Sequence, residues 1–261
     1  MLPQIAGQLP TLAATIAPLA GEVLEALKVV AAIGYRAVQL SATQVGTRPK
    51  DLDISGRKDL TVQLRRFGLS CAGLDLWIPS SHFIDPAFVD RAIDAVSQSI
   101  TLAAALGRCS VSLALPARTD RTQGNLNDVR AAVEACAQRE GVQVADHGVD
   151  AATGVWTPSS SGFVGVGIDP AVLLGANQDV CASVTKIGAR IVCARVVDLL
   201  RTGMRGPPGE PHDARLDLVA YMATLASISL YTSPVVDARQ WSDARAGLRI
   251  TLQRWSGGSS G

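Results

Sequence analysis

Helical and strand-like hydrophobic patterns alternate along most of the 261-residue chain, and glycines mark where one gives way to the other. At each junction a segment of helical periodicity ends at a glycine, and an apolar or β-branched run starts within about three residues. Glycine favours the left-handed backbone conformation in which many helices end, so short helix-to-strand loops are predicted. The junction glycines are Gly34, Gly68, Gly107, Gly141 and Gly188.

The predicted helices follow apolar faces and capping signals. One apolar face consists of Val23, Leu24, Leu27, Val30 and Ala31. Asp85 and Pro86 predict the start of a long helix that reaches about Leu106, because proline suits the first helical turn. Further helices are expected to begin near Asn125, Ala171, Asp213 and Gln240.

The strand pattern predicts the fold class. Runs such as VSLAL, VGVGI and RIVCARVV are almost continuously apolar, as expected of parallel strands covered on both faces. Strands are expected near Gln4, Ala37, Ala72, Ser112, Val142, Val166, Val192 and Val235. At roughly 32 residues per unit, this pattern predicts an α/β fold with a single (β/α)8 TIM barrel. A doubly wound open sheet is the alternative.

Two segments depart from the repeat. The sequence between Val144 and Val166 is rich in Gly, Pro and Ser, so we expect the fifth helix to be missing or vestigial. The apolar surface left by a missing helix would suit a homodimer interface. The domain is expected to span residues 1–255, and the SGGSSG sequence of residues 256–261 to be a flexible tail.

Composition narrows the classes of function. Hydrophobic residues make up 48% of the chain, which is enough for a sizeable core. The formal net charge of +1 gives no reason to expect nucleic acid or an anionic membrane as a partner. Five cysteines without a C-x-x-C pair indicate reduced thiols in a cytoplasmic protein. The apolar N-terminal stretch contains a proline and charged residues, so neither a signal peptide nor a membrane span is expected.

Chemistry in a parallel barrel takes place at the carboxyl ends of the strands. The residues at these positions include Gln39, Ser41, Asp75, Trp77, Leu115, Asp146, His147, Asp169, Arg195, Asp198 and Asp237. An aspartate after a strand often caps the next helix. Each of these carboxylates, taken alone, is therefore either a helix cap or part of an active site. Several carboxylates converging on one rim favour a site, because they repel one another without a cation or protons.

The motifs GYRAVQLSA, LDLW, VADHG, VGIDPAVLL, ARVVD followed by RTGMRGPPGE, and PVVDARQW occur in this order over nearly the whole chain. In order and spacing the chain resembles the xylose-isomerase-like TIM-barrel superfamily, which includes sugar phosphate isomerases and epimerases and the AP endonuclease family 2 type. The resemblance implies a small sugar or polyol substrate and proton transfer next to a carbonyl, assisted by a divalent metal. Zinc chemistry of the endonuclease type is not expected, because the chain has three histidines and no cysteine pairs.

The metal site implied by the resemblance is degenerate here. The family's ligand after the fifth strand falls on Ala145, and the ligand after the seventh falls on Arg195. Asp169 and Asp237 match the remaining two. An arginine side chain has no free lone pair, so we hypothesise that the Arg195 cation occupies the metal position and pairs with both aspartates. The alternative is that Arg195 binds a substrate phosphate or carboxylate.

The resemblance assigns roles to the remaining positions. Proton transfer is expected from Asp169, Asp237 and His147, although His147 is alternatively a structural histidine. Substrate binding is expected from Trp77, Arg195, Arg201, Arg205 and Glu210. No cofactor is expected; the alternative is a manganese or magnesium ion held by Asp146, Asp169, Asp198 and Asp237.

Two functions follow from this sequence. The first is a sugar or polyol (phosphate) isomerase, epimerase or dehydratase with an altered, metal-free site. The second is a non-catalytic TIM barrel that binds a carbohydrate-like ligand or a protein partner, because a fold does not guarantee an activity.

Overall fold

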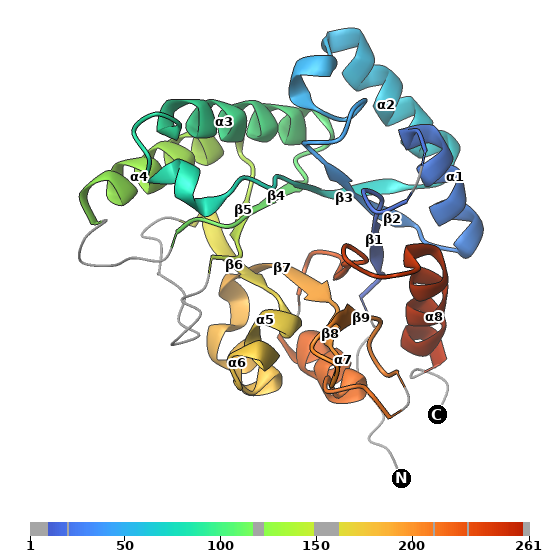
Figure 1. Cartoon of the computed structure of the whole chain (residues 1–261). Coiled ribbons are helices and arrows are strands. Elements are labelled where there is room, and N and C mark those ends of the chain that lie inside the picture. The colour runs from blue at the N-terminus through green and yellow to red at the C-terminus, as the bar shows by residue number, and fades with distance from the viewer. Residues whose placement is uncertain are drawn as a thin grey trace.

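A closed barrel of parallel strands forms the centre of the molecule (Figure 1). The computed structural model describes residues 10–19, 21–116, 123–148, 162–210, 212–228 and 230–257, with the backbone alone for 123–125. The barrel strands are β1 (Ala13–Thr15), β2 (Ala37–Ser41), β3 (Ser70–Asp75), β4 (Ser110–Leu113), β5 (Val144–Asp146), β6 (Val164–Ile168), β7 (Ile191–Val196) and β10 (Val235–Val236). They pair in chain order, and β10 pairs with β1 to close the ring. The prediction of a TIM barrel is confirmed, and the open sheet is wrong.

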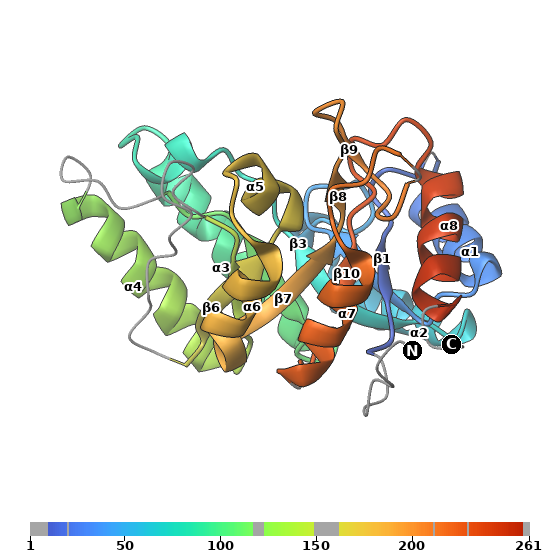
Figure 2. The ribbon, with the colours of Figure 1, turned by 90° about the horizontal axis from the view of Figure 1, so that it is seen from below.

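Helices surround the barrel and connect its strands (Figures 1 and 2). They are α1 (Val23–Ile33), α2 (Ile54–Arg66), α3 (Val89–Ala105), α4 (Gln123–Glu140), α5 (Pro170–Gly175), α6 (Val180–Ile187), α7 (Leu218–Ser227) and α8 (Ala244–Gly257). After β7 the chain forms a small antiparallel hairpin of β8 (Asp198–Leu199) and β9 (Arg205–Gly206). No helix in the described part of the chain is both long and apolar enough to cross a membrane.

The five junction glycines all have positive φ, as the sequence predicts, but Gly188, with ψ of −131°, lies outside the left-handed helical region. Their φ angles are 117° at Gly34, 66° at Gly68, 101° at Gly107, 64° at Gly141 and 58° at Gly188. Residues with a Cβ rarely adopt positive φ, so glycine suits these sharp connections. The helix-to-strand punctuation therefore reflects a backbone requirement repeated around the barrel.

Several predicted boundaries are wrong. The first barrel strand is Ala13–Thr15, whose backbone pairs with both β2 and β10, and Gln4 lies outside the described residues. Helix α3 begins at Val89 instead of Pro86, because the Asp85 side chain accepts a hydrogen bond from Ala87 N at 2.9 Å and closes a turn first. Leu24 was expected on the buried face of α1 but is 39% exposed. Ala26 lies on that face instead.

Two predictions concern parts of the chain that are described only in part. The expected loss of the fifth helix concerns the segment between β5 and β6, most of which, residues 149–161, lies outside the described residues. The tail was expected from residue 256, but residues 256 and 257 belong to α8, which ends at Gly257. Residues 258–261 are outside the description.

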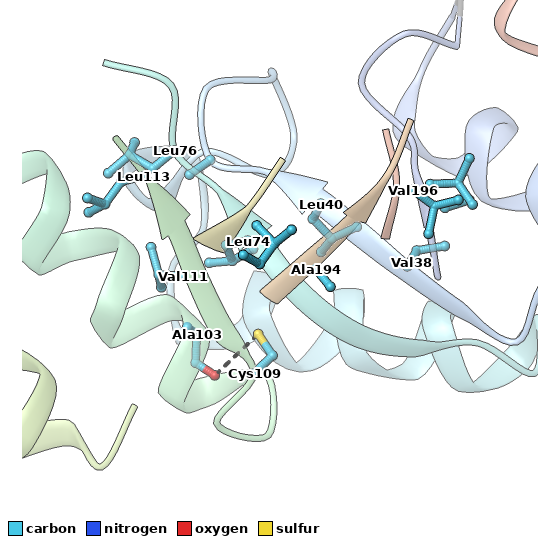
Figure 3. Packing of buried hydrophobic residues seen from close by; sticks show 14 of the residues in the cluster. Val38, Leu40, Leu74, Leu76, Ala103, Cys109, Val111, Leu113, Ala194 and Val196 are labelled. Atoms are coloured by element: carbon cyan, nitrogen blue, oxygen red, sulfur yellow. Dashed lines mark hydrogen bonds between the residues drawn. The ribbon is translucent and has the colours of Figure 1, made fainter. Parts of the chain in front are cut away.

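Strand alternation divides the core into two layers. Outward-facing side chains such as Val38, Leu40 and Leu74 pack in the layer between the barrel and the helices (Figure 3). Cys109 also belongs to this layer, where its Sγ donates to Ala103 O at 3.8 Å. A second, smaller cluster contains the mostly small side chains of Ala13, Ala37, Ala145, Val192, Cys193 and Val235. At the carboxyl ends of the strands the side chains that meet are larger and charged.

Candidate active site

The Arg195 side chain lies among three carboxylates at the carboxyl ends of the barrel strands. Asp75 ends β3, Asp169 follows β6, Arg195 is near the end of β7 and Asp237 follows β10. Arg195 Nη1 lies 3.0 Å from Asp169 Oδ2 and 3.5 Å from Asp237 Oδ2, and Nη2 lies 3.2 Å from Asp75 Oδ1. Arg195 is only 9% exposed, so its charge is paired almost entirely within the protein.

Two further arginines complete this arrangement. Arg205 Nη2, from β9, lies 3.0 Å from both Asp169 Oδ2 and Asp237 Oδ2. Arg239 Nε and Nη2 each lie 2.7 Å from one Asp237 oxygen, and Nη1 lies 2.5 Å from Asp75 Oδ2. Three positive and three negative formal charges therefore meet at the mouth of the barrel. We call this group the arginine–aspartate cluster: Asp75, Asp169, Asp237, Arg195, Arg205 and Arg239.

The cluster affects its members differently. Burial acts to raise the pKa of Asp237, but hydrogen bonds from Arg239 and the charges of all three arginines outweigh it and hold the pKa below its ordinary value. Burial raises the pKa of Asp75, and its arginine partners offset this only in part. Burial opposes the charged form of Arg195, but the three carboxylates raise its pKa, so it stays protonated. Asp237 is therefore a poor proton acceptor.

Asp169 is both a helix cap and a member of the cluster. Its Oδ1 accepts hydrogen bonds from Ala171 N at 3.1 Å and Val172 N at 3.4 Å, at the start of α5. Its Oδ2 faces Arg195 and Arg205. The sequence left open whether this residue caps a helix or belongs to the site. It does both, because one carboxylate oxygen caps α5 and the other contacts the arginines.

His147 is a buried imidazole beside the cluster. It is 8% exposed, and neither ring nitrogen has a hydrogen-bond partner among the described residues. The ring packs over Gly167, where an added Cβ would lie 2.4 Å from it, so glycine is required at that position. Burial lowers the pKa of His147 well below its ordinary value, and the charges of Arg195 and Arg239 lower it further. The imidazole is therefore neutral near pH 7, and the same surroundings oppose its protonation.

Asp146 and Asp198 lie in other surroundings. Asp146 Oδ2 pairs with Arg130 Nη1 at 2.9 Å, and Oδ1 accepts from Leu115 N at 3.0 Å and Gly148 N at 2.8 Å. Asp146 faces α4 because strand alternation turns Ala145 inward and Asp146 outward. Asp198 accepts from the backbone N–H groups of residues 215 and 216. The four-carboxylate metal site is thus wrong as a set, because only Asp169 and Asp237 come together.

The residues at the family's metal positions do not fit a divalent ion. Ala145 offers no donor atom and Arg195 offers no lone pair. Guanidinium groups already contact Asp169 and Asp237. Among the residues that the structure describes, no group of three or more His, Cys, Asp and Glu side chains could hold a metal ion.

The other predicted substrate-binding residues lie outside the cluster. Trp77, in the segment that follows β3, is 67% exposed. Arg201 lines a separate hollow of about 530 Å³ with Leu174, Ala214 and Arg215. Glu210 Oε2 lies 3.3 Å from Arg254 Nη2 on α8. Of the five residues predicted to bind substrate, Arg195 and Arg205 belong to the cluster and the other three do not.

Asp75 and Arg239 are cluster members that were assigned no role from the sequence, and only Asp75 was named there, as a strand-end residue. Asp75 stands at a strand end, which was a usable signal, but it has no counterpart among the metal positions implied by the resemblance. Arg239 stands two residues after Asp237 and binds back to it through Nε. Charge balance could have pointed to Arg239, because three buried carboxylates need about as many cations to pair with.

No protein-family model and no curated protein matches this sequence. Solved structures do match its fold. L-ribulose 3-epimerase has a TM-score of 0.73 at 17% identity, covering 95% of this chain and 94% of that one. A xylose isomerase domain protein from Planctomyces limnophilus has a TM-score of 0.72 at 13% identity, covering 96% and 98%.

D-psicose 3-epimerase from Clostridium cellulolyticum H10, solved with D-tagatose, also has a TM-score of 0.72 at 13% identity, covering 95% of this chain and 98% of that one. These identities are low, so the similarity concerns the fold. The chain has the fold of the xylose isomerase-like TIM barrels, and the resemblance noted in the sequence is confirmed at that level.

Proposed function

We propose that this chain is a sugar or polyol isomerase or epimerase that moves a proton next to a carbonyl and uses arginines in place of a metal ion. The observation that carries the proposal is the position of Arg195, whose two terminal nitrogens lie 3.0–3.5 Å from the carboxylates of Asp75, Asp169 and Asp237. A guanidinium can stabilise the enediolate that forms when a proton leaves the carbon next to a carbonyl.

In this proposal His147 carries the proton. Its ring nitrogens have no partner among the described residues, and its lowered pKa keeps it in the neutral form that a base needs. Burial and the arginine charges make it a weak base, so the imidazolium would form only while the negative charge of the enediolate lies beside it. Asp169 and Asp237 hold Arg195 and Arg205 in position, because their oxygens are engaged by arginines. Arg195 and Arg205 donate to the developing oxyanion.

The free state of the cysteines supports a cytoplasmic location for this activity. All five cysteines are free thiols and form no disulfide bond, as is usual in a reducing compartment. We therefore keep cytoplasmic location and a small sugar or polyol ligand as parts of the proposal.

The test is solvent deuterium exchange at the carbon next to the carbonyl of a panel of ketoses, followed by proton NMR in buffer containing a chelator. We expect at least one ketose to exchange with the wild-type protein, and His147→Gln to slow exchange by about 10²–10⁴-fold. Arg91→Gln, an exposed change on α3, is the matched control and should leave the rate unchanged. Exchange that survives in His147→Gln, or that occurs only after a metal is added, contradicts the proposal.

A second candidate is a barrel that binds a carbohydrate-like ligand without catalysis. It is favoured by the saturation of Asp169 and Asp237, each of which accepts hydrogen bonds at both oxygens and so cannot serve as a base. Ligand binding without deuterium exchange, for every ketose in the panel, would select this candidate over the first.

A further inference from the structure

Two of the three carboxylates of the cluster, those of Asp169 and Asp237, have nearly all of their hydrogen-bond acceptor capacity in use. Each Asp169 oxygen accepts two hydrogen bonds, from backbone N–H groups at Oδ1 and from Arg195 and Arg205 at Oδ2. Asp237 Oδ1 accepts from Arg239 N at 3.2 Å and Nε at 2.7 Å. Its Oδ2 accepts from Arg205 at 3.0 Å and from Arg239 at 2.7 Å. A carboxylate oxygen has about two lone pairs, so these two aspartates have little acceptor capacity left.

Donors, in contrast, are in surplus. Within the described residues only Nη2 of Arg205 has hydrogen-bonded acceptors, although a guanidinium carries N–H groups on all three nitrogens. The Arg205 side chain is 18% exposed, so it borders solvent. Arg195 Nε is buried and likewise has no acceptor in the part of the chain that the structure describes. The acceptors that remain beside these donors are a ring nitrogen of His147 and the oxygens of Asp75, each of which accepts one hydrogen bond.

We propose that this site selects a ligand carrying an oxyanion, a carboxylate or a phosphate, over a neutral sugar of the same skeleton, and that Arg205 provides the selectivity. The inference rests on the proposed function for its choice of the barrel mouth as the ligand site. Sugar hydroxyls need acceptors as well as donors, whereas an oxyanion only accepts. Hydrogen bonds from a guanidinium to an oxyanion are also stronger than bonds to a neutral oxygen.

The experiment compares three probes that share one sugar ring: D-glucose, D-glucuronate and D-glucose 6-phosphate. Affinities are measured by isothermal titration calorimetry at one fixed ionic strength, with chelator present. We expect at least one charged probe to bind wild-type protein at least about tenfold more tightly than D-glucose. Whichever charged probe binds more tightly identifies the oxyanion as a carboxylate or as a phosphate.

Substitutions of Arg205 test whether this side chain provides the preference for the charged probe. Arg205→Gln should bring the preference for the charged probe to within about twofold of unity, and Arg205→Lys should keep part of it. Arg91→Gln should keep all of it. Thermal unfolding of each variant shows that the barrel remains folded.

Three results would overturn the inference: equal affinity for neutral and charged probes, no binding of either charged probe, or an undiminished preference in Arg205→Gln. Its failure is separable from failure of the proposed function. Deuterium exchange without a preference for charged probes refutes the selectivity alone. A preference that depends on Arg205, without exchange on any ketose, refutes the catalytic proposal alone.

Discussion

Two buried assemblies of aspartate and arginine lie at neighbouring strand ends and differ in what they leave unpaired. At the end of β5, Asp146 binds Arg130 and two backbone N–H groups, so both carboxylate oxygens are engaged on the side that faces α4. In the arginine–aspartate cluster, Asp169 and Asp237 accept two hydrogen bonds at each oxygen, while Arg205 keeps donors without an acceptor among the described residues. We call the first assembly closed because both oxygens of its carboxylate are engaged, although Arg130 Nε is buried without an acceptor among the described residues. We call the second open because partly exposed Arg205 has N–H groups without such an acceptor.

The comparison also shows what strand alternation does with one residue type. Asp146 and His147 are adjacent in sequence, yet Asp146 turns toward α4 and His147 faces the cluster. A one-residue change in register would exchange these roles. A carboxylate at a strand end is therefore informative only together with the face on which it lies.

The largest effect is expected from removing the central cation of the cluster. Arg195→Met leaves three buried carboxylates with two arginines, and we expect the free energy of unfolding to fall by about 3–5 kcal/mol. Chemical denaturation measures this, with Arg91→Met as a control that changes stability by less than about 0.5 kcal/mol. A loss below about 1 kcal/mol would mean that Arg195 does not balance these charges.

A smaller loss is expected in the closed assembly. Arg130→Met should lower the free energy of unfolding by about 2–3 kcal/mol, because Asp146 keeps its two backbone donors after the arginine is gone. Denaturation under the same conditions gives the comparison. If Arg130→Met costs as much as Arg195→Met, the two assemblies do not differ in the way proposed here.

His147 provides a pH-dependent test of the environment of the cluster. Because its pKa is lowered in the folded state, the unfolded chain takes up a proton at a pH where the folded protein does not. Stability should therefore fall as the pH drops below the ordinary histidine value of 6.5. The ordinary value in the unfolded chain limits the contribution of this one group to at most about 2 kcal/mol between pH 7 and pH 5.

His147→Gln isolates that contribution. Its unfolding free energy should change with pH less steeply than that of the wild type by up to this amount, in denaturation curves recorded at both pH values. Equal pH dependence in the two proteins would show that His147 titrates normally in the fold.

The smallest effect on stability is expected at the open edge of the cluster. Arg205→Gln should cost less than about 1 kcal/mol, since the residue is partly exposed and Arg195 and Arg239 continue to pair with the aspartates. Thermal unfolding checks this. A loss as large as that of Arg195→Met would make Arg205 a structural member of the cluster with no donors to spare.

Much of the fold could be predicted from the sequence because the patterns that indicate it are local. Glycines with positive φ and apolar strand runs appear residue by residue, and they indicated the barrel and most of its elements. The boundaries that were wrong depend on contacts far along the chain. Strand β1 is defined by pairing with β10, more than two hundred residues away, and no local pattern reports that pairing.

The site was predictable in part. The pairing of Arg195 with Asp169 and Asp237 was inferred from the metal positions that the resemblance implies, together with the chemistry of arginine, and the geometry contains it. The third carboxylate, Asp75, and the third arginine, Arg239, come from loops and strands whose convergence depends on closure of the barrel. The placement of Arg201 and Glu210 away from the cluster likewise depends on how the segment around β8 and β9 folds back, which sequence spacing does not specify.

The most direct test of the proposed arginine-for-metal replacement is a titration of manganese into chelator-treated wild-type protein, followed by isothermal calorimetry and thermal unfolding. If guanidinium groups occupy the metal position, manganese should neither bind stoichiometrically nor raise the melting temperature. Stoichiometric binding accompanied by a higher melting temperature would contradict the replacement.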